Sequence, residues 1–315
     1  GDLRHEGDPD PPAARGAGER GERERIRDRF WSPERPGCRL EKDKHYFVFR
    51  ASVLRVKNTK VTYPEYARLV DADGVIRMSL LMGMDDPAKG RDPNTSRDIN
   101  ADNFKDIKST LLKSGYKSQI WNRSEILRVT NGKTDRGYVE TFRKTLIRDG
   151  RPITLELEVF FGPSGISEDS TAFHWFFKRA LETKAIMMYD GHSGLGGHLD
   201  LESIEAANQF KIQPNKNKYQ IYFFNSCSSY TYYNKMYFSR KRTSTDPRGT
   251  KNLDIFTNGL ATYFHVMHDT NMALIRAVEA WASGKATISY QALAAEIDSD
   301  NLFGINGDED NPTRP

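Results

Sequence analysis

Short apolar runs alternate with segments of helical spacing through most of this chain, and the alternation constrains its fold more than any other feature. The runs ITLELEVFF from Ile153, AIMMYD from Ala185, QIYFFNS from Gln220 and LDIFT from Leu253 have the length and apolar content of buried strands. Strands joined by helices form right-handed crossovers and a parallel sheet that is covered on both faces. We therefore expect an α/β fold with a mostly parallel sheet flanked by helices.

The spacing of apolar residues predicts where the helices lie, and YKSQIW predicts a further short strand. The expected helices are one from Phe104 to Leu112 ended by Gly115, one marked by Tyr138, Phe142 and Leu146, one from Phe173 to Leu181, one opened by Asp200 as N-cap, one through Tyr232–Tyr237, and one from Leu260 to Trp281.

Composition divides the chain into five parts. Residues 1–43 are rich in Arg, Glu, Gly and Pro and predict a disordered charged arm, with a solvated linker favoured over an inhibitory pro-segment. Residues 44–84 contain strand signals that predict a small N-terminal β-rich module, and residues 85–99 predict a linker. Residues 100–297 hold the α/β domain, and residues 298–315 predict an acidic, solvated tail that lacks the spacing of a Ca²⁺ loop.

Charge and hydropathy argue against two classes of partner. The 47 basic and 43 acidic residues leave a net charge of +4, too balanced for a nucleic-acid or membrane-surface protein. No apolar run reaches the roughly 18 residues of a membrane span. The chain begins at Gly1, so we expect a processed product, and a secreted or periplasmic location with the leader removed stays open. Cys38 and Cys227 make no disulfide framework.

Two apolar runs end in chemically active side chains. His192 follows AIMMYD in the stretch DGHSGLGG, and Cys227 follows QIYFFNS, one crossover unit later. Neighbouring parallel strands end side by side, so we expect both residues within reach of one substrate. A thiol attacks as thiolate, and a nearby imidazole can take its proton. The glycines of the loop allow close approach of a substrate backbone.

These two strand ends resemble those of the caspase-like cysteine peptidases, a group that includes caspases, legumains, gingipains, clostripain and separase. In that group the catalytic His follows the third core strand and the Cys follows the fourth. If YKSQIW and ITLELEVFF are strands one and two, DGHSGLGG and FFNSCSS end the third and fourth here. The resemblance covers roughly residues 100–297. The chain lacks the Gln-Ala-Cys of caspases, so we do not expect it to be a caspase.

The resemblance implies a cysteine endopeptidase with Cys227 as nucleophile and His192 as general base and acid. It also implies a polypeptide substrate, a thioester acyl-enzyme and no cofactor or metal. The family usually has Gly directly after the His, whereas this chain has Ser193 and then Gly194. The backbone amides of these two residues are the candidate oxyanion donors.

Further residues near the two strand ends are candidates for supporting roles. Asp190 is a candidate to orient the histidine, with a strand-end cap as the alternative. Asn225, Thr257 and Asn258 are candidates to shape the substrate pocket, because they also lie at strand ends. His198 is a candidate binding residue, with a solvent-facing loop position as the favoured alternative.

Two other functions compete with a peptidase. The serine after His192 favours a catalytically silent binding or scaffold protein on the same fold. A zinc-dependent hydrolase is a lesser alternative, with ligands drawn from His192, His198, Cys227, His265 and His268. The spacing of these residues matches no compact ligand motif.

Overall fold

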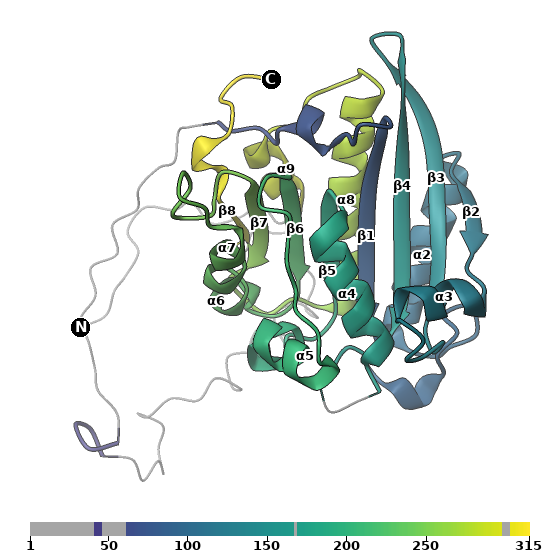
Figure 1. Cartoon of the computed structure of the whole chain (residues 1–315), viewed down its shortest axis with the longest axis vertical. Helices are drawn as coiled ribbons and strands as arrows, with labels where there is room; N and C mark the ends of the chain where they lie inside the picture. The colour runs from purple at the N-terminus through teal and green to yellow at the C-terminus, as the bar shows by residue number, and fades with distance from the viewer. Residues whose placement is uncertain (1–40, 46–60, 167–168, 298–302) are drawn as a thin grey trace, which may run out of the picture. The chain divides into compact units, whose positions relative to one another are not determined.

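Figure 1 shows the computed structural model of the chain, which describes residues 41–45, 61–166, 169–297 and 303–315. The chain divides into two compact units, Gly1–Asn58 and Thr59–Pro315. Nearly all of the expected arm, and the strand expected from His45 to Val56 beyond its first residue, fall outside the described residues. The elements that follow all belong to the second unit.

The described part of the second unit contains one eight-stranded sheet with the spatial order β2-β3-β4-β1-β5-β6-β7-β8. The strands are β1 (Val75–Gly83), β2 (Lys117–Ile120), β3 (Tyr138–Arg148), β4 (Arg151–Gly162), β5 (Ile186–Asp190), β6 (Gln220–Asn225), β7 (Leu253–Asn258) and β8 (Phe303–Asn306). Strands β4, β1, β5, β6 and β7 are parallel to one another. In chain order these five strands have the arrangement 2-1-3-4-5 of a doubly wound sheet. The expected α/β fold with a mostly parallel sheet is confirmed.

Helices cover both faces of the sheet (Figure 1). They are α2 (Ile99–Lys113), α3 (Arg123–Val129), α4 (Thr171–Thr183), α5 (Leu201–Asn208), α6 (Ser229–Tyr232), α7 (Lys235–Lys241), α8 (Phe264–Ala282) and α9 (Tyr290–Ile297). Apolar side chains of α2, α8 and α9 pack in one core cluster, and those of α4, α5 and α7 pack in the other. No helix among the described residues is long and apolar enough to cross a bilayer.

The central strands are wholly buried because both of their faces are covered. Ile186 and Met188 of β5 belong to the α2/α8 core, whereas Met187 and Tyr189 belong to the α4 core. This arrangement explains why the strand sequence is continuously apolar instead of alternating. Asp190 continues the alternation and therefore faces the α2/α8 side.

The helix expected around Tyr138, Phe142 and Leu146 is wrong. Residues Tyr138–Arg148 form β3, which pairs antiparallel with β4 through Arg148 opposite Arg151. A spacing of four residues fits one face of a strand as well as one face of a helix, because it is a multiple of two. Pairing with β4 in a hairpin makes this segment a strand, and the spacing of its apolar residues alone could not distinguish a strand from a helix.

The expected β-rich module ending at residue 84 also needs correction. The segment Val75–Gly83 is β1, and it lies at the centre of the large sheet between β4 and β5. It is therefore strand one of the parallel set, β4 is strand two, and YKSQIW is the antiparallel edge strand β2. The first two strands are therefore not the ones on which the resemblance was based. The strands β5 and β6 remain the third and fourth parallel strands in chain order.

The expected linker and tail are parts of the same unit. Asp98 in the 85–99 loop caps α2 by accepting a hydrogen bond from the Asn100 amide at 2.9 Å. The tail contributes β8, which pairs antiparallel with β7. Asn311 is buried and donates to the Asp254 carboxylate at 2.7 Å. Residues 303–315 therefore pack on the domain, which corrects the expectation of a solvated tail.

Candidate active site

Three adjacent parallel strands, β1, β5 and β6, end at the same edge of the sheet. In the register of the sheet, Asp190 of β5 lies opposite Asn225 of β6. His192 and Cys227 each follow two residues later, so the chain leaves the two strands at matching positions. Asp85 follows β1 on the other side of β5. An acid, an imidazole and a thiol thus occupy neighbouring strand ends at the switch point of the doubly wound sheet, where such folds bind ligands.

The first two of these residues contact each other directly. His192 Nε2 and Asp85 Oδ1 lie 2.9 Å apart, with 47% of the histidine side chain exposed. The hydrogen bond from His192, aided by the Lys89 ammonium, holds the pKa of the Asp85 carboxyl below its usual range. The edge of Phe264 packs on the imidazole at a ring-centroid distance of 5.2 Å. The ring is therefore oriented by an ionised carboxylate, and Nδ1 remains as the nitrogen that can act on a thiol.

Cys227 sits at a sharp turn between β6 and α6. Its thiol is half-buried and donates to the Thr262 carbonyl at 3.4 Å, instead of to His192. The next residue, Ser228, has a left-handed backbone with φ of 48°, which is uncommon for a residue other than glycine. The Ser228 amide donates to the Leu260 carbonyl at 2.8 Å. Backbone strain of this kind persists only where the surrounding structure maintains it, and it is common at functional sites.

Glycine in the histidine loop makes room for a second histidine. Gly194 has φ of 54°, and a Cβ atom there would lie 2.1 Å from Cδ2 of His198. His198 is half-buried, contacts the His192 backbone, and has its pKa lowered by burial. The Tyr189 hydroxyl also donates to the His192 carbonyl, at 2.7 Å. His198 therefore supports the loop from beneath and is not the solvent-facing residue that the sequence favours.

The backbone around the site offers hydrogen-bond donors. Within the described ranges, the amides of Ser193, Gly194 and Cys227 have no hydrogen-bond acceptor. The Ser193 carbonyl is engaged, because it accepts from the Tyr233 hydroxyl at 2.8 Å. Unpaired amides at strand ends are suited to bind a developing negative charge.

Asp190 does not orient His192. Its side chain is fully buried and accepts a hydrogen bond from Asn271 of α8 at 2.8 Å, while its other carboxylate oxygen has no partner among the described residues. Burial raises the pKa of Asp190 to about 7. The strand's alternation turns Asp190 toward α8, and the orienting role falls to Asp85 instead.

The other strand-end residues form a buried polar layer beneath the cysteine turn. Asn225 donates to the Thr270 hydroxyl of α8 at 2.6 Å. The Asn258 side chain donates to the Asn225 side-chain oxygen and to the Ser226 backbone carbonyl, each at 3.4 Å. Thr257 is buried as well. The structure places these side chains under the turn that carries Cys227, where they hold the turn in position.

The histidines considered as zinc ligands do not converge. His268 contacts Thr110 at 3.2 Å and Asp269 at 3.0 Å, and His265 lies beside Tyr263. The described residues contain no group of three histidine, cysteine or acidic side chains arranged to hold a metal ion.

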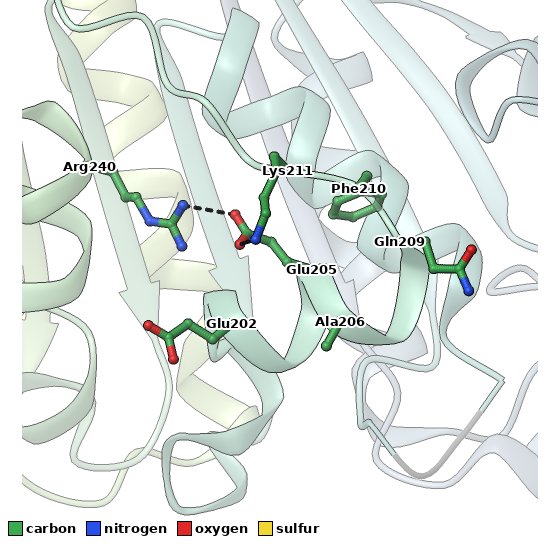
Figure 2. A pocket seen from close by; sticks show the side chains of 7 residues that line it. All are labelled: Glu202, Glu205, Ala206, Gln209, Phe210, Lys211 and Arg240. Carbon is green, nitrogen blue, oxygen red and sulfur yellow. Dashed lines mark hydrogen bonds and ion pairs between the residues drawn. The ribbon is translucent and has the colours of Figure 1, made fainter.

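A surface hollow of about 630 Å³ lies between α5 and α7, and none of Asp85, His192 and Cys227 lines it (Figure 2). Glu205 lines it and already pairs with Lys211 and Arg240, each at 2.9 Å. The charge of Glu205 is therefore neutralised within the protein. The hollow contains no nucleophile, and we assign it no role.

Sequence reasoning misses Asp85, because it opens the polar stretch DDPAKG, whose composition predicts a linker. The available signal is its position directly after the apolar run GVIRMSLLMGM. Once that run is recognised as a core strand, Asp85 becomes a strand-end residue like His192 and Cys227.

The site therefore combines an oriented imidazole, a partly exposed thiol on a strained turn and unpaired amides. Comparisons of the chain with protein-family models, with curated proteins and with solved structures find no match.

Proposed function

We propose that this protein is a cysteine endopeptidase in which Cys227 is the nucleophile, His192 is the general base and acid, and Asp85 is the positioning residue. One observation carries the proposal: these residues end three adjacent parallel strands in the order acid, imidazole, thiol, with the acid bonded to the imidazole. Nucleophilic sites of this kind are identified by geometry and roles, not by sequence position.

The order of the residues along the chain supports the same proposal. His192 follows the third parallel strand and Cys227 follows the fourth, as the resemblance to caspase-like peptidases implies. The Ser193 in place of glycine does not remove a backbone donor, because the proposed contact uses the amide and not the side chain.

The reaction follows from these groups. His192 takes the thiol proton, and the Cys227 sulfur attacks the scissile carbonyl carbon to form a C–S bond. The amides of Ser193 or Gly194 and of Cys227 hold the oxyanion of the tetrahedral intermediate. The C–N bond then breaks, and the amine leaves with the proton from the imidazolium. Water activated by His192 attacks the thioester, releasing the carboxylic acid and restoring the thiol.

A second candidate is a catalytically silent binding protein on this fold. The observation that favours it is the hydrogen bond from the Cys227 thiol to the Thr262 carbonyl, which directs the thiol to that carbonyl instead of to His192. In the peptidase this bond must break when substrate arrives. In the silent protein it persists.

The rate of Cys227 alkylation by iodoacetamide between pH 5 and pH 9 tests the proposal. The chain has two cysteines, so a Cys38→Ser background isolates the signal. We expect the wild-type profile to extend to lower pH than that of His192→Ala, with rates at pH 6 differing by at least tenfold. His268→Ala is a matched control, because this histidine contacts Thr110 away from the site. Identical profiles for wild type and His192→Ala would contradict the peptidase and favour the silent protein.

A further inference from the structure

The loops around Cys227 carry no charged side chains. Residues 193–199, 226–234 and 259–268, which follow β5, β6 and β7, contain no Asp, Glu, Lys or Arg, although 29% of the chain is charged. The nearby charged groups on the loop after β1 are already paired, Asp85 with His192 and Lys89 with Asp85. A substrate side chain bound among these loops would therefore meet no fixed countercharge.

Large apolar side chains are exposed on the same loops. Leu195 is 87% exposed, and Tyr230, Leu260 and Tyr263 are each more than half exposed. Leu195 also has a left-handed backbone with φ of 54°, which apolar residues rarely adopt. Exposed apolar residues gathered in one region mark a binding surface more often than scattered ones do.

The backbone segment that carries two of these side chains, Leu260 and Tyr263, contacts the cysteine turn. The Leu260 carbonyl accepts from the Ser228 amide at 2.8 Å, and the Thr262 carbonyl accepts from the Cys227 thiol at 3.4 Å. The segment 260–263 thus lies along the cysteine turn, and its residues Leu260 and Tyr263 are exposed. A residue whose carbonyl is attacked by Cys227 would place its own side chain next to this segment.

We propose that the substrate residue whose carbonyl Cys227 attacks is large and apolar, and that Leu260 and Tyr263 bind its side chain. This inference rests on the proposed peptidase function and specifies its substrate class. The loops provide apolar surface and no partner for a buried charge, so acidic and basic side chains lose hydration without compensation.

The test uses four peptidyl acyloxymethyl ketones that differ only in the residue before the electrophile: Leu, Phe, Asp and Arg. Labelling of the full chain in the Cys38→Ser background is followed by intact mass. We expect the Leu and Phe probes to react at least tenfold faster than the Asp and Arg probes. Leu260→Lys and Tyr263→Lys are expected to slow the Leu probe and to accelerate the Asp probe.

Ile147→Lys provides the matched control, because Ile147 is 61% exposed at the hairpin end of β3, away from the loops. It should leave all four rates unchanged. Fastest labelling by the Asp or Arg probe, with labelling still lost in His192→Ala, overturns the apolar preference but keeps the peptidase. Equal rates for all probes, unaffected by His192→Ala, overturn both proposals.

Discussion

The two ends of the parallel strands are built differently. At the amino end, buried polar groups bond to one another, although Asp254 Oδ1 has no partner among the described residues. Asp254 accepts hydrogen bonds from the Tyr219 and Tyr290 hydroxyls and from Asn311, so the last residues of the chain are tied to β7. Lys241 donates to three oxygens, including Gln220 Oε1 at 2.8 Å.

At the carboxyl end of the strands, polar side chains remain accessible to a ligand. Asp85 and His192 are bonded to each other but partly exposed, and the Cys227 thiol has only a weak carbonyl acceptor. Ser228 and Leu195 have left-handed backbones within the loops. The difference indicates that the amino end stabilises the fold, whereas the carboxyl end is kept for binding and chemistry.

The largest expected effect is on activity at the carboxyl end. Cys227→Ala should lower peptide hydrolysis on the order of 10³- to 10⁶-fold, because it removes the sulfur that forms the thioester. The free energy of unfolding should change little, since the thiol is half-buried and forms one weak hydrogen bond. Turnover of a fluorogenic peptide and urea unfolding measure the two quantities. Retained turnover would exclude Cys227 as nucleophile.

At the amino end, Asp254→Ala should instead destabilise the fold. It removes the shared acceptor of Tyr219, Tyr290 and Asn311, and leaving such buried donors unpaired costs about 2–4 kcal/mol. Urea unfolding at pH 6 measures the loss. Alkylation of Cys227 in the folded variant should match wild type, and a large change in that rate would show that the two ends are coupled.

Asp190 sharpens the comparison, because it is a buried carboxyl at the carboxyl end. Its pKa of about 7 lies above the unfolded value of about 3.9. Between these values the folded protein holds a proton that the unfolded chain releases, so wild-type stability falls as pH rises from about 4 to about 7. Asp190→Asn removes this loss, and its stability relative to wild type should improve by about 2.5 kcal/mol between pH 5 and pH 8.

The pKa of Asp254 is also raised by burial to about 7, but Asp254 is present in both proteins and its contribution cancels. Urea unfolding at the two pH values measures the relative stability. A constant difference between wild type and Asp190→Asn would mean that Asp190 is ionised in the folded state.

The smallest expected effect is that of Asp85→Asn. The amide keeps the shape of the side chain but loses the charge that orients His192, so we expect peptide hydrolysis to fall about tenfold. Stability should hardly change, because both partners are partly exposed. Asn94→Asp adds a carboxylate on the loop after β1 without touching His192 and serves as a control. Unchanged hydrolysis in Asp85→Asn would remove Asp85 from the mechanism.

The sequence by itself is sufficient for the features that depend on local pattern. Continuous apolar runs predict β5 and β6 as buried parallel strands, and the residues that follow them, His192 and Cys227, are candidates from their place in the sequence alone. Asp200 is also predicted correctly as the N-cap of α5, where it accepts from the Ser203 amide at 2.7 Å. These features are encoded within a few residues of the chain.

Only the tertiary structure decides which distant segments become neighbours. The four-residue spacing of β3 fits a helix and a strand equally, and its pairing with β4 settles the choice. Asp85 reaches His192 because β1 pairs with β5 across 107 residues of chain, while the adjacent Asp190 is turned toward α8 by strand alternation. Long-range pairing of this kind depends on the packing of the whole sheet, which no local pattern contains.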